Sequence, residues 1–262
     1  MTARPAHLGP EYASQFRDEA VVAAYHHRPA YSPGVVPVLH ELLAHKPRVV
    51  LDLGCGTGDI ARLLVGSVDR VDAVDISRRM VARGRFQPGG AHRRLNWLVA
   101  AAESLPLRGP YGFVTAGESL HWMEWSSVLP ALQSLLVPGG LLGILGREEV
   151  ASPRTTALLR AISDFSTNRD FRPYDLIQEL AQRRLFRVTG ACTTIPDVIR
   201  QPVTSYIESI HSRNGFSRDR MSPGAALEFD ERVQELLRPY ARNGTLEVKI
   251  STSITWGLPG HF

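Results

Sequence analysis

The sequence predicts an α/β fold built around a doubly wound, mostly parallel sheet. Apolar runs with the length of buried strands alternate with segments of helical periodicity from about residue 35 to residue 146. The run Val49–Leu53 leads directly into a turn with glycine at positions 54, 56 and 58, and helical apolar spacing follows from Ile60. A buried strand that enters a helix through such a turn is typical of the first unit of a parallel sheet.

The remaining elements follow in order. Helical spacing predicts helices at 35–43, 58–65, 77–84 and 126–136, and strands are expected at 48–53, 71–75, 95–99, 111–116 and 141–146. Pro138-Gly139-Gly140 predicts a turn before the fifth strand. Beyond residue 148, helices are expected at 155–164, 174–184, 204–213 and 225–238, and a sixth strand begins at Phe186. Period-two alternation over 245–255 predicts an antiparallel last strand, which makes seven.

Length and composition favour one elaborated domain over residues 1–262. The hydrophobic content of 44% supplies a sizeable core. No apolar run approaches the roughly 20 residues that a membrane-spanning helix needs, and no signal peptide is evident, so we expect a cytoplasmic protein without a membrane partner. Cys55 and Cys192 are the two cysteines, and free thiols are expected because Cys55 lies in the glycine turn.

The formal net charge of +4 raises the question of a nucleic-acid partner. The excess is small, and almost all of the positive charge is arginine. The arginines between residues 78 and 94 form the densest cluster, with few aromatic residues among them. A solvated surface explains this cluster better than an RNA-binding patch does, so nucleic acid is not expected as a partner.

The glycine turn predicts a small-molecule cofactor, because residues without side chains let backbone amides approach a ligand closely. A dinucleotide fingerprint would need a small residue at position 59, where this chain has Asp59. Asp52 and Asp59 add negative charge, which disfavours a pyrophosphate and favours a cationic ligand. Asp75 ends the second strand 17 positions after Gly58 and could accept the hydroxyls of a ribose. That feature alone does not separate the two kinds of cofactor.

Three motifs in order resemble those of class I S-adenosylmethionine-dependent methyltransferases, especially the small-molecule group of ubiquinone/menaquinone-biosynthesis and trans-aconitate methyltransferases. The motifs are 51-LDLGCGTG-58, 74-VDIS-77 and 102-AESLPL-107. The similarity covers roughly residues 20 to 148. It implies a Rossmann-like fold with a helical cap and S-adenosyl-L-methionine as the cofactor.

The resemblance also assigns the cofactor site residue by residue. Asp52 would lie near the amino group of the methionine part and Asp75 would hold the ribose, while Ile76 faces the adenine ring and a backbone amide at Ala102 meets its edge. The methionine part would lie on the turn, at Gly54, Cys55, Gly56 and Gly58. Two alternatives stay open, since Asp52 could merely anchor the loop and Gly58 could merely permit helix packing.

The chain departs from its relatives at Ala101, where many of them carry an aspartate that accepts the adenine amino group. Glu103 is the nearest acid, and it could either replace that aspartate or point toward the following helix. Gly117, His121 and Trp122 follow the fourth strand, where ligands bind in open α/β sheets. His121 could act as a general base for the acceptor, or the His-Trp pair could only pack beneath the cofactor.

Tyr25 and Arg28 lie in an aromatic and basic segment that related sequences close over the cofactor, and Arg28 could pair with its carboxylate. An ordinary entry loop packed by tyrosines is the alternative. His26-His27 lacks a third ligand at a defined spacing, so no metal site is expected.

These observations predict a methyltransferase that moves a methyl group from S-adenosylmethionine to a small organic acceptor, by O-, N- or C-methylation. The segments expected are an N-terminal lid (1–33), a cofactor-binding core (34–148), mainly helical substrate-cap elements (149–244) and a final strand (245–256). Two alternatives are an RNA methyltransferase and a protein of the same fold that binds the cofactor without methylating. The sequence does not specify the acceptor, its reacting atom or the choice between monomer and homodimer.

Overall fold

Two compact units make up the chain in the computed structural model, which describes residues 5–44 and 46–262. The first unit contains the described residues up to Ala30 together with Glu148–Arg172 and Pro196–Ser251. The second contains Tyr31–Arg147, Pro173–Ile195 and Thr252–Phe262. The lid, the substrate cap and the single-domain organisation expected from the sequence stay predictions.

An eight-stranded sheet runs in the order β3-β2-β1-β4-β5-β8-β6, and β7 also pairs with β8. β1, β2, β3, β4 and β5 form parallel pairs, while β8 runs antiparallel to β6 and β7. The strands are β1 (Val49–Leu53), β2 (Arg70–Asp75), β3 (Leu95–Val99), β4 (Tyr111–Gly117), β5 (Leu136–Glu149), β6 (Phe186–Thr193), β7 (Asp197–Pro202) and β8 (Thr245–Pro259). The predicted doubly wound fold with an antiparallel last strand is confirmed.

Strand order reverses between β1 and β4, because β2 and β3 lie on one side of this pair and β5 on the other. Ligands in open α/β sheets bind at the carboxyl ends of the strands at such a reversal. The loop that follows β1 and the segment that follows β4 therefore lie where a ligand is expected.

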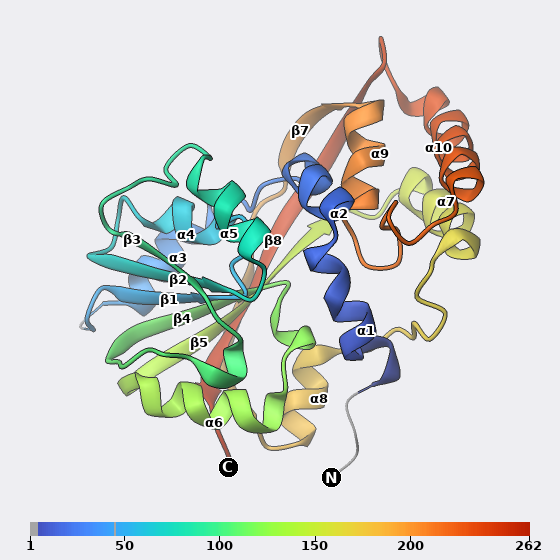
Figure 1. Cartoon of the computed structure of the whole chain (residues 1–262). Helices are drawn as coiled ribbons and strands as arrows, with labels where there is room; N and C mark the ends of the chain where they lie inside the picture. Colours follow the sequence, from blue (N-terminus) through green and yellow to red (C-terminus); the bar gives the residue numbers. More distant parts are fainter. Residues whose placement is uncertain (1–4, 45) are drawn as a thin grey trace. The chain divides into compact units, whose positions relative to one another are not determined.

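Five helices belong to the second unit. In Figure 1, α3, α4 and α5 cover one face of its sheet, and α6 and α8 cover the other. They are α3 (Val35–Leu42), α4 (Asp59–Leu64), α5 (Arg78–Arg85), α6 (Trp125–Leu135) and α8 (Leu176–Gln182), with the short 3-10 helices η4 (Ala102–Ser104) and η5 (Leu120–Trp122).

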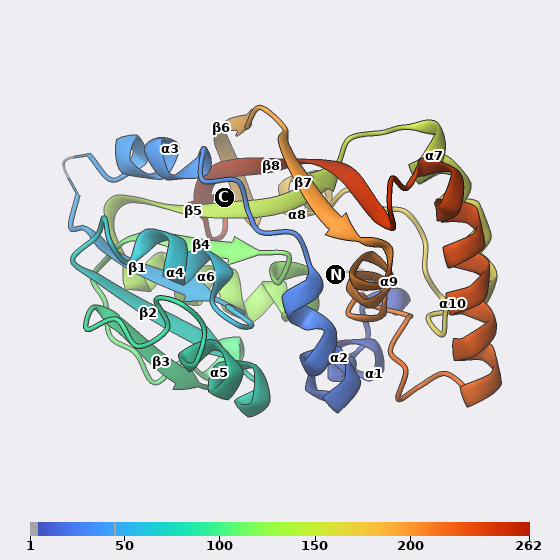
Figure 2. The ribbon, with the colours of Figure 1, turned by 90° about the horizontal axis from the view of Figure 1, so that it is seen from above.

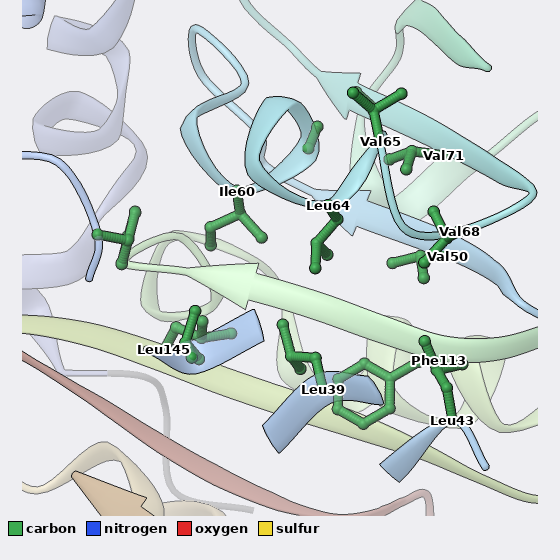
Figure 3. Close-up of a cluster of buried hydrophobic side chains, with 14 of the residues drawn as sticks. Leu39, Leu43, Val50, Ile60, Leu64, Val65, Val68, Val71, Phe113 and Leu145 are labelled. Carbon is green, nitrogen blue, oxygen red and sulfur yellow. The ribbon is translucent and has the colours of Figure 1, made fainter. Parts of the chain in front are cut away.

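The core of the second unit lies between the first two of these helices and the sheet (Figure 3). α3 contributes Leu39, α4 contributes Ile60 and Leu64, and the sheet contributes Val50 and Phe113, all of which are nearly inaccessible to solvent. Burying five such side chains stabilises the fold by roughly 1.5–3 kcal/mol each. This packing holds the amino end of α4, where the glycine turn ends, against β1 and β4.

The first unit has its own apolar core, formed by one face of each of three helices and by the beginning of β8. Figure 2 shows α7 and α10 alongside each other. Phe229 of α10 contacts the rings of Phe165 and Phe216 within this core. The helices of this unit are α1 (Pro10–Ala13), α2 (Glu19–Ala24), α7 (Pro153–Ile162), α9 (Val203–His211) and α10 (Pro223–Leu237), with 3-10 helices η1 (Ala6–Leu8), η2 (Ser14–Arg17), η3 (Tyr25–His27), η6 (Ser163–Phe165) and η7 (Arg238–Tyr240).

Two features of the sheet differ in detail from the expectation. β7 is an eighth strand that was not predicted, because its residues are mostly exposed and show no apolar alternation. β5 begins at Leu136, before the predicted turn, and Pro138-Gly139-Gly140 lies within it. The pairing of β5 with β4 is irregular at these residues, because its register shifts from Tyr111↔Leu136 to Phe113↔Leu141.

Over the described part of the chain, no helix combines the length and the apolar character that crossing a membrane requires.

Candidate functional site

The glycine turn between β1 and α4 adopts a backbone that other residues rarely take. Gly54, Gly56 and Gly58 have φ of +67°, +56° and +79°, in the left-handed region. A Cβ at Gly54 would lie 2.5 Å from the Cβ of Ser119, and one at Gly58 would collide with the ring of Trp97. Glycine is thus required at both positions, and the close neighbour of Gly58 is the ring of Trp97 in β3.

Asp75 joins the end of β2 to this turn. Its Oδ2 accepts a hydrogen bond of 2.7 Å from the backbone N–H of Gly56, and its Oδ1 accepts one of 2.7 Å from Ser77. Both oxygens of the carboxylate thus accept from backbone N–H groups, one in the turn and one just after β2. The side chain is only half-buried. The structure thus brings the predicted ribose acid and the predicted cofactor loop into direct contact.

Two apolar side chains flank Asp75 and remain exposed. Ile76 follows it and is 49% exposed, and Val99 at the end of β3 is 46% exposed. Val99 pairs in register with Asp75, so their side chains lie on the same face of the sheet. Exposed apolar groups beside a carboxylate suit a ligand with a flat apolar ring and a polyol. The sequence analysis named Ile76 but missed Val99.

Ala102 and Glu103 lie in η4, just beyond the end of β3. The Oε1 of Glu103 accepts a hydrogen bond of 2.9 Å from the backbone N–H of Glu124, the residue that caps the amino end of α6. Of the two possibilities raised for Glu103, the structure places its carboxylate on the following helix. Its predicted role toward the cofactor stays a prediction.

Asp52 lies beneath the glycine turn, 1% exposed. Its Oδ2 accepts from the N–H of Ala61 in α4 at 3.1 Å, and its Oδ1 accepts from the hydroxyl of Thr115 in β4 at 2.8 Å. Burial raises the pKa of Asp52 to about 7, although these two hydrogen bonds oppose the shift. This geometry is the anchoring role that the sequence left open, and contact with the cofactor stays a prediction.

The negative charge expected at the turn is largely compensated. Asp59, the first residue of α4, forms ion pairs with Arg62 at 2.7 Å and with Arg147 at 3.5 Å. The raised pKa of Asp52 also favours its neutral form. The sequence analysis counted the negative charge of Asp52 and Asp59 but did not foresee the two arginines that pair with Asp59.

Cys55 lies inside the turn with a half-buried, unoxidised thiol. Burial, assisted by the negative charge of Asp75, raises the pKa of this thiol well above its ordinary value. Its backbone N–H donates to the carbonyl of Val74 at 2.9 Å, which further ties the turn to β2.

The segment after β4 lies against the turn. The hydroxyl of Ser119 donates to the carbonyl of Leu53 at 2.7 Å, and Gly117 faces Ile60 of α4 so closely that a Cβ there would collide with it. His121 and Trp122 follow in η5, with their ring centroids 4.7 Å apart and both side chains partly buried. Gly117, His121 and Trp122 are thus carried by the segment that contacts the glycine turn.

Tyr25 and Arg28 belong to the first unit. The guanidinium of Arg28 stacks on the ring of Tyr25, with its Cζ 4.5 Å from the ring centroid. It also donates to the hydroxyl of Ser212 at 2.8 Å and to the carbonyl of the same residue. These contacts show how the segment is held within its own unit, and the predicted contact with the cofactor stays a prediction.

Comparison with known proteins finds a family to which part of the chain is similar. Residues 50–140 match the methyltransferase-domain family, and this range includes the glycine turn, Asp75 and the segment after β4. That range of the chain is therefore similar to a methyltransferase domain. Trans-aconitate 2-methyltransferase of Methylobacterium radiotolerans is 34% identical over 133 residues, which cover 47% of this chain and 48% of that protein. The chain spans about half the length of the curated relatives it matches.

Solved structures share the fold of this chain. A protein from Anaeromyxobacter dehalogenans, described as a candidate type II methyltransferase, aligns with a TM-score of 0.63 at 20% identity, over 88% of this chain and 99% of its own. A phosphoethanolamine N-methyltransferase of Haemonchus contortus aligns with a TM-score of 0.54 at 14% identity, over 100% of this chain and 61% of its own. That structure contains phosphomonomethylethanolamine and S-adenosylhomocysteine.

Proposed function

We propose that the protein binds S-adenosylmethionine at the carboxyl ends of β1, β2 and β3 and transfers its methyl group to a small organic acceptor. The hydrogen bond between the N–H of Gly56 and Asp75 carries this proposal, because it holds a close-approach backbone turn next to a half-buried carboxylate. The Haemonchus contortus neighbour, which contains S-adenosylhomocysteine, supports the choice of cofactor.

The described residues fit the parts of this cofactor. Asp75 would accept the ribose hydroxyls, Ile76 and Val99 would contact the adenine ring, and the turn from Gly54 to Gly58 would receive the methionine part. S-adenosylmethionine supplies a methyl group already activated by a positively charged sulfur. The remaining task of the protein is to align the reactants, exclude water and, for some acceptors, remove a proton.

His121 is the candidate for proton removal. It follows β4 in η5, on the segment that contacts the cofactor loop through Ser119. Replacing His121 with alanine should lower turnover with little change in cofactor affinity if the imidazole acts as a base. Unchanged turnover would leave His121 with a packing role beside Trp122.

The names of the relatives support a small organic molecule as the acceptor. Trans-aconitate 2-methyltransferase is named for a small organic acid, and the Haemonchus contortus enzyme is named for a phosphorylated amine. Both acceptors are small molecules of different chemistry, so we propose a small organic acceptor and no particular reacting atom.

Calorimetry and isotope transfer test the proposal. The protein should bind S-adenosylhomocysteine with one site per chain and should not bind NAD. Incubation with methyl-labelled S-adenosylmethionine and fractionated metabolites should then label one small molecule, which mass spectrometry identifies. Saturation by NAD with no heat from S-adenosylhomocysteine would overturn the proposed cofactor. Label in RNA instead of a metabolite would overturn the acceptor class.

A further inference from the structure

A buried arginine in β5 contacts three separate segments of the second unit. The side chain of Arg147 is 6% exposed. Its Nη2 lies 2.5 Å from the Oε2 of Glu118, its Nη1 lies 3.5 Å from the Oδ2 of Asp59, and its Cζ lies 4.4 Å from the ring centroid of Tyr31. Desolvating a guanidinium costs free energy unless its charge and donors are met, and here two carboxylates and an aromatic face meet them.

Glu118 adopts a backbone conformation that a glutamate rarely takes. Its φ is +49°, in the left-handed region that costs free energy for residues with a Cβ. Its N–H donates to the carbonyl of Leu145 at 3.0 Å, and its carboxylate accepts from both the backbone N–H and the side chain of Arg147. Such strain persists only where surrounding contacts impose it, and it concentrates at functional sites.

The partners of Arg147 belong to the two loops of the candidate site. Asp59 comes directly after Gly58, the last glycine of the cofactor turn. Glu118 comes directly after β4 and three residues before His121. One planar guanidinium that contacts both carboxylates restricts the distance between these two segments, in addition to the hydrogen bond from Ser119 to Leu53.

We propose that Arg147 is a positioning residue that fixes the segment from Glu118 to Trp122 against the cofactor turn. The inference deepens the proposed function, on which the role of that turn rests. Arg147 does not touch the reacting groups. It acts through Glu118 and Asp59, so that the residues after β4 face the cofactor in one arrangement.

Hydrogen exchange of the full chain tests this role, with three variants. Arg147→Met keeps the length of the side chain and removes its charge and donors. Glu118→Asn keeps a residue that accepts the left-handed backbone but is too short to reach Arg147. Arg70→Met is the matched control, because Arg70 also pairs with a carboxylate, that of Asp72, and lies 5.9 Å from the ring centroid of a tyrosine.

Without ligand, Arg147→Met and Glu118→Asn should each speed amide exchange in residues 118–122 by about tenfold, whereas Arg70→Met should leave these amides unchanged. The double variant should exchange no faster than either single variant, because both remove the same link. Wild-type exchange at 118–122 in both variants would overturn the proposal. Equal acceleration by Arg70→Met would also overturn it, since that result indicates general destabilisation.

S-adenosylhomocysteine separates this proposal from the proposed function. In the wild-type protein the ligand should slow exchange both in residues 54–59 and in residues 118–122. In Arg147→Met it should still bind and protect 54–59, while the protection of 118–122 is lost. Protection of 118–122 that persists in this variant would overturn the positioning role. A wild-type protein that does not bind the ligand would overturn the proposed function, and the ligand-free comparison would still decide whether Arg147 holds the segment.

Discussion

The two ends of the same parallel sheet carry clusters made from the same three kinds of side chain. Near the amino ends of the strands, Asp72 accepts hydrogen bonds from Tyr111 at 2.6 Å and Asn96 at 2.8 Å and pairs with Arg70. At the carboxyl ends, Arg147 contacts Glu118, Asp59 and Tyr31. Each cluster therefore combines an arginine, a carboxylate and a tyrosine.

The two clusters differ in which charge is buried. Asp72 is 7% exposed and its arginine is 44% exposed, whereas Arg147 is 6% exposed and Glu118 is 29% exposed. The partners of Asp72 are residues of the strands themselves, so that Asn96 links β2 to its neighbour β3 and Tyr111 links β2 to β4, beyond β1. Asp59 and Glu118 instead lie at the junctions that follow the cofactor turn and β4. Similar chemistry thus stabilises the sheet at one end and arranges loops at the other.

Gly54→Ala should have the largest effect, at the carboxyl end. Alanine would have to adopt the left-handed φ of Gly54, and its methyl group would collide with Ser119. We therefore expect the free energy of unfolding to fall by roughly 2–5 kcal/mol and ligand binding to be lost. Gly139→Ala is the matched control, with φ of +75° and no atom within 4 Å of the added Cβ, and should cost only about 1–2 kcal/mol. Urea unfolding measures both. Equal losses would show that the contact with Ser119 is unimportant.

Asp72→Ala should test the amino-end cluster. Removing this buried carboxylate leaves the hydroxyl of Tyr111 and the amide of Asn96 without the acceptor of their hydrogen bonds. We therefore expect the free energy of unfolding to fall by roughly 2–4 kcal/mol. The affinity for S-adenosylhomocysteine should not change. Titration calorimetry at a temperature below the unfolding transition measures this affinity. A variant with native stability and weakened ligand binding would reverse the roles we assign to the two ends.

Asp75→Ala tests whether the two ends of a single strand, β2, differ in their effect on ligand affinity. We expect it to weaken S-adenosylhomocysteine binding by about 1.5–3 kcal/mol, the range for hydrogen bonds to a charged group. Asp69→Ala, at an exposed residue just before the amino end of β2, is the control and should leave affinity unchanged. Unchanged affinity in Asp75→Ala would refute the ribose role.

Asp52→Asn should have the smallest effect, visible as a change in pH dependence. The folded-state pKa of Asp52, about 7, lies above its ordinary value of 3.8, so the folded protein binds this proton more tightly than the unfolded chain does. The resulting stability is present at low pH and is lost as pH rises toward and through 7. Between pH 6 and pH 7 the wild-type protein should lose roughly 1 kcal/mol that the variant does not lose. Urea unfolding measures the free energy of unfolding at each pH. If this free energy changed equally with pH in both proteins between pH 6 and pH 7, the raised pKa of Asp52 would be contradicted.

Local sequence patterns predict most of the second unit. The strand runs, the glycine turn and the helices from α3 to α6 each depend on short-range periodicity or on backbone preferences, and the structure confirms them. β7 has neither signal, because its exposed residues pair with β8 through backbone hydrogen bonds that any sequence could form.

Contacts between distant residues set the limit of sequence reasoning at the site. Glu103 had two possible directions, and only the fold brings the N–H of Glu124 within reach of its carboxylate. Val99 becomes a candidate through its register with Asp75, which no linear pattern encodes. Arg147 and Glu118 are 29 positions apart, and the sequence analysis assigned neither a role. A glycine turn can be predicted from neighbouring residues in a sequence, whereas an ion pair between distant residues cannot.

The protonated state of the thiol in the glycine turn has a practical consequence. Alkylating reagents attack thiolates, so Cys55 should react slowly with maleimides near neutral pH, and burial also raises the pKa of Cys192. A new cysteine at Phe86, which is 90% exposed, should therefore take up a fluorophore selectively without removal of the native thiols. The protein is thus suited to labelling with a fluorophore at one chosen site.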